Sequence, residues 1–127
     1  MPDRIRDFVA SMNLRPSDRV LEVGCGHGVA AGLICALLTT GRYTAVDRSA
    51  AMLRHATARN DAFVRAGIAE FVRGDLETVD LGTRRFDKVL AMRVALFHRE
   101  PARAEALARR WMAPGGRLYV QYDTPGG

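Results

Sequence analysis

The sequence is poor in lysine, in cysteine and in long apolar runs, and each shortage excludes a class of protein. The single lysine, Lys88, lies far from the glycine-rich segment, which excludes a phosphate-binding loop of the G-x-x-x-x-G-K-[ST] type. Two cysteines, Cys25 and Cys35, lie in apolar surroundings, which favours reduced buried thiols over a disulfide or redox pair. The longest apolar run, residues 29–38, is half of the roughly 20 residues that a membrane span needs. MPDRIRDF does not resemble a secretion signal, so we expect a cytoplasmic protein.

The positive charge is spread along the chain. The formal net charge is +5, and arginines run from Arg4 to Arg117 with few adjacent pairs. A nucleic-acid surface tends to show a basic run with aromatic residues between the charges, and the sequence has none. Solvated faces are therefore the favoured interpretation, and an anionic or nucleic-acid partner is the alternative.

Strand and helix patterns alternate from end to end. A length of 127 residues predicts one domain over residues 1–127. Apolar spacing predicts helices over 3–12, 28–39, 50–59 and 101–112, with a further helical turn through residues 63–67, and strands over 19–23, 43–47, 70–73, 86–92 and 117–123. The alternation predicts an α/β doubly wound parallel sheet with helices on both faces. Ligands of such sheets bind beyond the carboxyl ends of the strands.

Three glycines follow the first predicted strand at alternate positions. The stretch E-V-G-C-G-H-G over residues 22–28 puts Gly24, Gly26 and Gly28 between two apolar segments. Glycines in such a turn let a ligand approach the backbone N–H groups. A dinucleotide fingerprint, G-x-G-x-x-G, would need a glycine where Val29 stands, so neither a dinucleotide nor a triphosphate fits well.

Four motifs in order resemble those of the class I S-adenosylmethionine-dependent methyltransferases. They are the loop just described, A-V-D-R-S-A-A-M-L over 45–53, G-D-L over 74–76 and P-G-G-R-L-Y-V over 114–120. The resemblance covers the chain from about Arg19 to Tyr122. It implies a Rossmann-like sheet of strand order 3-2-1-4-5 and S-adenosylmethionine as the cofactor.

The resemblance assigns roles to individual residues. Asp47, 19 residues after Gly28, is placed to accept hydrogen bonds from both hydroxyls of a ribose. The family uses an acid at the position of Asp75 to accept from the adenine amino group, and Glu22 is implied to orient the loop and reach the methionine ammonium. Met52 is also interpretable as a core residue. The full set of implied cofactor contacts is Glu22, Gly24, Cys25, Gly26, Gly28, Asp47, Arg48, Met52, Asp75, Leu76 and Met92.

Several motifs are missing from residues 93–100, and their absence narrows the choice of methyl acceptor. The segment RVALFHRE, implied to lie over the transferable methyl group, has no [ND]-P-P-[YF] set, no paired glutamates and no acid cluster for a metal ion. Neither cysteine lies where a base-attacking thiol should. Elimination favours a small-molecule acceptor and metal-independent transfer. His98 is the candidate general base, because imidazole titrates near neutral pH, and a surface or packing histidine is the alternative.

The sequence stops soon after the fifth predicted strand. The family's sheet normally adds an antiparallel hairpin there, so we expect a sheet shortened after strand five. Its edge, with Leu118 and Val120, would be open to pairing with a second copy in a homodimer. The alternatives to a small-molecule methyltransferase are a cofactor-binding but inactive or truncated domain, a nucleic-acid methyltransferase and a nucleotide-binding oxidoreductase.

Overall fold

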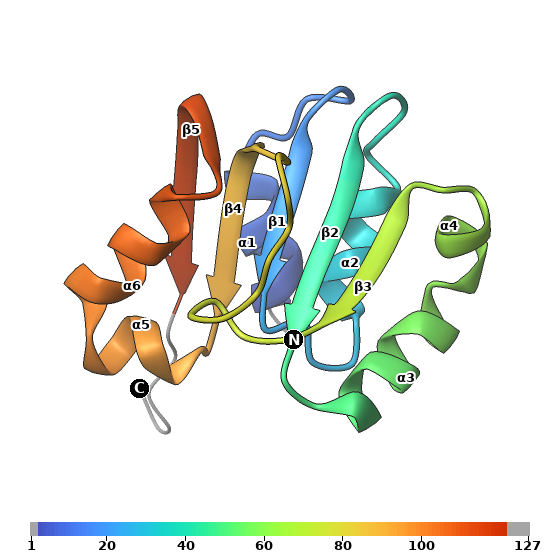
Figure 1. Cartoon of the computed structure of the whole chain (residues 1–127). Coiled ribbons are helices and arrows are strands. Elements are labelled where there is room, and N and C mark those ends of the chain that lie inside the picture. The colour runs from blue at the N-terminus through green and yellow to red at the C-terminus, as the bar shows by residue number, and fades with distance from the viewer. Residues whose placement is uncertain (1–2, 122–127) are drawn as a thin grey trace.

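A five-stranded, wholly parallel sheet forms the centre of the protein (Figure 1). The computed structural model describes residues 3–121. The strand order is β3-β2-β1-β4-β5, which confirms the predicted fold class and order. The strands are β1 (Arg19–Val23), β2 (Arg42–Asp47), β3 (Ala69–Arg73), β4 (Phe86–Met92) and β5 (Met112–Gln121).

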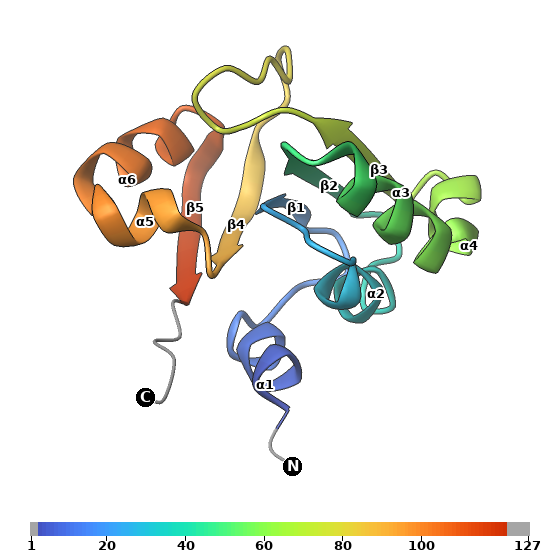
Figure 2. The same cartoon turned by 90° about the horizontal axis from the view of Figure 1, so that it is seen from below.

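Helices cover both faces of the sheet (Figure 2). One face carries α1 (Arg4–Ser11), α2 (Val29–Cys35), α3 (Ala50–Arg59) and α4 (Asp61–Arg65). The other carries α5 (Ala95–Arg99), α6 (Pro101–Arg109) and the long connection between β3 and β4. Each face has its own apolar core, as expected where helices cover a parallel sheet on both sides.

Alternate residues of β1 belong to the two different cores. Val20 packs with α1 and α2, whereas Leu21 and Val23 pack with α6 and the β3–β4 connection. Val20 and Leu21 are fully buried. This burial on both sides explains why the strand sequences show no alternation of apolar and polar residues.

Most predicted boundaries agree with the structure within a few residues, and the carboxyl-terminal third corrects three of them. α5 was not predicted, and α6 ends at Arg109 rather than at residue 112. Pro114, Gly115 and Gly116, expected in the turn that ends the helix, lie within the bounds of β5. The pairing of β4 with β5 shifts register between Phe86 and Lys88, and Gly115, in the stretch of β5 that holds the extra residues, has a positive φ of 78°.

Two further expectations concern the outer edge of β5. β5 pairs with β4, and within residues 3–121 it has no neighbour on its other side. Val120 on this strand is 44% exposed. Tyr122 and Asp123, expected at the strand's end, lie outside the described residues, and pairing of this edge with a second copy stays a prediction. None of the helices within residues 3–121 is long and apolar enough to cross a membrane.

A largely buried ion pair ties the segment before β1 to the centre of the sheet. Lys88 Nζ lies 2.7 Å from Asp18 Oδ2, and the two side chains are 13% and 7% exposed. The same carboxylate oxygen accepts a hydrogen bond from the Arg15 backbone N–H at 2.8 Å. The one lysine of the sequence therefore has a structural role.

Substituting Lys88→Met should lower the free energy of unfolding by about 3 kcal/mol, because it leaves Asp18 buried without its cation. Urea denaturation followed by circular dichroism measures the change. Arg65→Met is the matched control, since the ion pair that Arg65 makes with Asp61 is exposed and should contribute little. Equal effects of the two substitutions would contradict the structural role given to Lys88.

Candidate functional site

A cavity of about 490 Å³ lies where β1, β2, β3 and β4 end. Its wall contains the first loop glycine, the end of β2, the turn after β3 and the start of α5. This is the carboxyl edge of the sheet, where ligands of doubly wound folds bind. The lining residues are Val23, Gly24, Val46, Asp47, Arg48, Gly74, Asp75, Leu76, Glu77, Arg93, Val94, Ala95, Leu96, Arg99 and Glu100.

The glycine loop is closely packed at both ends and open in the middle. Gly24 and Gly28 have φ of 79° and 83°. A Cβ at Gly24 would lie 2.9 Å from Val94 Cγ2, and one at Gly28 would lie 2.7 Å from Asn60 Nδ2. A Cβ at Gly26 would meet nothing within 4 Å. Gly24 and Gly28 therefore leave room for protein side chains, and Gly26 has open space beside it. Contact of all three glycines with a ligand stays a prediction.

Asn60 fixes the loop to the end of α3. Its side-chain N–H group donates to the backbone oxygens of Gly28, at 3.0 Å, and Ala56, at 2.9 Å. Asn60 is 3% exposed, so these bonds are shielded from water. Sequence reasoning missed this residue, because an asparagine between two helices carries no signal of a partner 32 residues earlier.

Asp47 joins the loop to the next helix. Its Oδ2 accepts a hydrogen bond from the Gly26 N–H at 3.1 Å, and its Oδ1 accepts from the Ser49 N–H at 2.9 Å. Ser49 in turn caps α3 by accepting from the Met52 N–H at 3.2 Å, as predicted. Each carboxylate oxygen has two lone pairs, so both oxygens of Asp47 can accept a further bond from a ligand hydroxyl.

Asp75 organises the turn after β3. Its Oδ1 accepts from the backbone N–H groups of Glu77, at 2.9 Å, and Thr78, at 3.0 Å, and from the Thr78 hydroxyl. The other oxygen makes no hydrogen bond within residues 3–121. Leu76, which follows, is 4% exposed and lines the cavity. The turn therefore contributes an acid and an apolar residue to the cavity wall.

Glu22 lies outside the cavity wall. It is 2% exposed, and the Tyr43 hydroxyl donates to its Oε1 at 2.6 Å. Burial raises the pKa of the Glu22 carboxyl to about 7, against the opposing effect of the Tyr43 hydrogen bond. Burial and the nearby carboxylate also raise the pKa of the Tyr43 hydroxyl well above its ordinary value. Sequence reasoning missed Tyr43 as the partner of this acid.

The cavity brings together five of the eleven residues predicted to contact a cofactor: Gly24, Asp47, Arg48, Asp75 and Leu76. The lining does not include the other six, Glu22, Cys25, Gly26, Gly28, Met52 and Met92. Cys25 is 6% exposed, and burial raises its thiol pKa to about 12, so it is a packed thiol rather than a reactive one. His98 is exposed on α5 and is also absent from the lining. Within residues 3–121, no three His, Cys, Asp or Glu residues gather into a metal-binding group.

Arg93 and Arg99 line the cavity and were not singled out from the sequence. Arg93 directly follows β4 with φ of 59°, and its N–H donates to the Gln121 oxygen at 2.7 Å. Arg99 is the last residue of α5. Sequence reasoning placed residues 93–100 near the reacting group, but neither the short helix nor the unusual backbone of Arg93 has a local signature.

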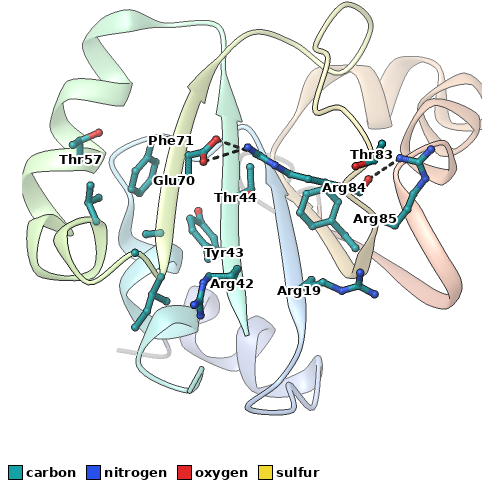
Figure 3. A pocket seen from close by; sticks show the side chains of 15 residues that line it. Arg19, Arg42, Tyr43, Thr44, Thr57, Glu70, Phe71, Thr83, Arg84 and Arg85 are labelled. Atoms are coloured by element: carbon teal, nitrogen blue, oxygen red, sulfur yellow. Dashed lines mark hydrogen bonds and ion pairs between the residues drawn. The ribbon is translucent and has the colours of Figure 1, made fainter. Parts of the chain in front are cut away.

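A second cavity, of about 720 Å³, lies toward the opposite edge of the sheet (Figure 3). Its wall contains the first residues of β1, β2, β3 and β4. Its arginines are engaged within the protein: Arg84 crosses the sheet to Glu70 at 2.9 Å, and Arg85 lies over the Trp111 ring at 5.5 Å. It contains none of the predicted site residues, so the smaller cavity at the carboxyl edge is the candidate site.

The family described as "Methyltransferase domain" matches residues 20–116. A protein-L-isoaspartate O-methyltransferase of Methylorubrum populi is 36% identical over 121 residues, 94% of this chain and 52% of that protein. A fatty-acid O-methyltransferase of Mycolicibacterium smegmatis is 34% identical over 113 residues, 84% of this chain and 39% of that protein.

A solved methyltransferase structure has the same fold. The S-adenosylmethionine-dependent methyltransferase of Geobacter sulfurreducens, in complex with S-adenosylhomocysteine, superimposes with a TM-score of 0.79 at 21% identity. The alignment covers 94% of this chain and 47% of that one. The chain thus spans about half, or less, of the length of the proteins it matches.

The buried Glu22 gives stability a defined pH dependence. Between its ordinary pKa of 4.5 and about pH 7, the folded state keeps a proton that the unfolded chain has lost. The wild-type free energy of unfolding should therefore fall as pH rises through this range. Relative to the wild type, Glu22→Gln should gain about 3 kcal/mol between pH 4.5 and pH 8.

Urea denaturation of both proteins at several pH values measures this difference. Glutamine retains an oxygen that can accept from the Tyr43 hydroxyl, so the substitution removes the titrating group and keeps the hydrogen bond. A difference that stays constant with pH would show that the carboxyl titrates normally and would contradict the assignment.

Proposed function

The chain belongs to the S-adenosylmethionine-dependent methyltransferases, and from this premise we propose that it transfers the methyl group of S-adenosylmethionine to a small-molecule acceptor without a metal ion. The family match covers most of the chain, from residue 20 to residue 116. We also propose that residues 1–127 act as one cofactor-binding domain. The activity and acceptor of the whole protein belong to this proposal, because the matched relatives are about twice as long or longer.

The junction of Gly26 and Asp47 is the observation that carries the proposal. Space is open beside Gly26, and the Asp47 carboxylate lies in the cavity wall with capacity for two hydroxyl donors. Asp75 and Leu76 line the same cavity, with an acceptor oxygen for an amino group and an apolar surface for a ring. These residues fit the ribose and adenine parts of the cofactor.

For methyl transfer, the protein mainly has to align the acceptor with the methyl group and exclude water. The cofactor supplies a methyl group on a cationic sulfur. The apolar side chains of Val94 and Leu96 at the start of α5 line the cavity next to the end of β4 and would shield the acceptor from water. His98 stays a prediction as general base, and its position outside the cavity wall gives it no support.

The small-molecule acceptor is supported by the name of one relative, the fatty-acid O-methyltransferase. The other relative is named for a protein acceptor, L-isoaspartate. We propose the small molecule because the cavity, at about 490 Å³, is a concave, partly open site of the size that small ligands occupy. Two buried free thiols, Cys25 and Cys35, support a reducing, cytoplasmic location.

A second candidate function is cofactor binding without turnover. It is favoured by one observation: the chain matches only about half of the isoaspartate methyltransferase and less of the fatty-acid methyltransferase. Residues that complete an acceptor pocket in those proteins can lie in the unmatched part. Binding and transfer therefore need separate measurements.

Calorimetric titration with S-adenosylhomocysteine tests the shared premise of both candidates. We expect micromolar binding by the wild type and at least tenfold weaker binding by Asp47→Ala, since hydrogen bonds to a charged group contribute about 1.5–3 kcal/mol. Asp61→Ala, which removes an exposed acid on α4, should bind like the wild type. NAD should give no binding. A folded wild-type chain that binds NAD, or neither ligand, would overturn the proposed function.

A further inference from the structure

We propose that the methyl acceptor is a carboxylic acid, held by Arg93 and Arg99 and methylated on its carboxylate. This inference rests on the proposed function and names the substrate class of the same site. Three features of the molecule support it: the charges around the cavity at the carboxyl edge, the backbone of Arg93 and the types of side chain in the cavity wall.

The acids that line the cavity are engaged within the protein. Asp47 and Asp75 accept backbone hydrogen bonds, as described above. Glu77 Oε2 lies 2.6 Å from an Arg103 guanidinium nitrogen, and Glu100 Oε2 lies 3.5 Å from the other terminal nitrogen of Arg103. Arg103, which is outside the cavity wall, thus offsets one of the two negative charges of these glutamates.

The arginines that line the cavity are not engaged in this way. Arg93 and Arg99 are exposed at its wall, and neither makes a side-chain hydrogen bond or ion pair with another of residues 3–121. Arg48 also lines the cavity, but it directly follows Asp47, which is assigned to the cofactor. Two arginines of the cavity wall, Arg93 and Arg99, therefore have guanidinium donors available for a ligand. A guanidinium binds a carboxylate through two parallel hydrogen bonds.

The backbone of Arg93 argues that its side chain is needed there. A φ of 59° lies in the left-handed region, where glycine or asparagine is the ordinary choice and other residues are strained. Strained residues of this kind cluster at sites that bind ligands or react. Fold requirements alone would favour glycine, so the long cationic side chain points to a function in the cavity.

The cavity wall holds no side chain suited to remove a proton from a neutral acceptor. In the described part of the chain, its lining contains no His, Lys, Tyr or Cys. Of its acids, Asp47 and Asp75 are assigned to the cofactor, and Glu77 and Glu100 pair with Arg103. An alcohol or a protonated amine would need a base to become a nucleophile. A carboxylate is already ionised at neutral pH and needs none.

The transfer balances without a proton. A carboxylate oxygen forms the new O–CH₃ bond, the S–CH₃ bond of the sulfonium breaks, and its electron pair stays on sulfur. The acceptor becomes a neutral methyl ester, and S-adenosylhomocysteine leaves as a neutral thioether. Val94 and Leu96 give the carbon skeleton of the acid an apolar surface beside the two guanidinium groups.

The test measures binding of matched probes to the chain saturated with S-adenosylhomocysteine. Acetate, benzoate and octanoate are titrated by calorimetry, each beside its primary amide. We expect at least one carboxylate to bind saturably and its amide not to bind. The double substitution Arg93→Gly and Arg99→Gln should weaken the binding of that carboxylate about 10- to 100-fold, because hydrogen bonds to a charged group are lost. Arg59→Gln, which removes an exposed arginine of α3, should have no effect.

Two controls test whether weaker carboxylate binding arises from misfolding or from weaker cofactor binding. Arg93→Gly alone should leave the free energy of unfolding unchanged or raise it, because glycine adopts this φ freely, so weaker carboxylate binding would not reflect misfolding. S-adenosylhomocysteine should bind equally to the wild type and to the arginine variants. Weaker cofactor binding by the variants would assign the arginines to the cofactor's own carboxylate and overturn the inference.

The remaining outcomes are equally distinct. If the saturated wild type binds none of the three carboxylates, or binds acids and amides alike, the carboxylate inference is wrong while the proposed function stands. If the wild type fails to bind S-adenosylhomocysteine at all, the proposed function itself fails. Methyl transfer from labelled S-adenosylmethionine to octanoate, released as methanol in base, would extend binding to turnover.

Discussion

The hydrogen bond from the Gly26 N–H to the Asp47 carboxylate, 3.1 Å long, is the interaction on which the site depends. It joins the loop after β1 to the end of β2, where a second bond of 2.7 Å runs from the Gly24 N–H to the Val46 oxygen. The other Asp47 oxygen accepts from Ser49, the residue that caps α3. One carboxylate thus orders the open part of the loop, the start of a helix and one wall of the cavity.

Packing behind the loop supports this arrangement. Gly28 admits the Asn60 side chain, and Asn60 ties the loop to α3 with two buried hydrogen bonds. Beneath the loop, Glu22 and Tyr43 satisfy each other inside the first apolar core. Because burial raises the pKa of Glu22 to about 7, its ionisation at alkaline pH costs the folded state free energy.

The sequence predicted the parts of this structure that depend on local pattern. The strand order, the cap at Ser49 and the place of Asp47 follow from apolar runs and from short motifs with fixed spacing. The hydrogen bonds of Asn60, the register shift near Gly115 and the left-handed backbone of Arg93 depend on contacts or backbone geometry without a local signature. For the same reason, motif matching could not tell which predicted cofactor residues line the cavity and which lie outside its wall.

Nuclear magnetic resonance of the labelled chain tests the central claim most directly, because its amide signals report each segment separately. Addition of S-adenosylhomocysteine should shift the signals of Gly26, Asp47 and Leu76 at the carboxyl edge of the sheet. The signals of Arg42 and Glu70, which line the larger cavity toward the opposite edge, should stay in place. Shifts confined to the larger cavity, or none at saturating ligand, would contradict the account.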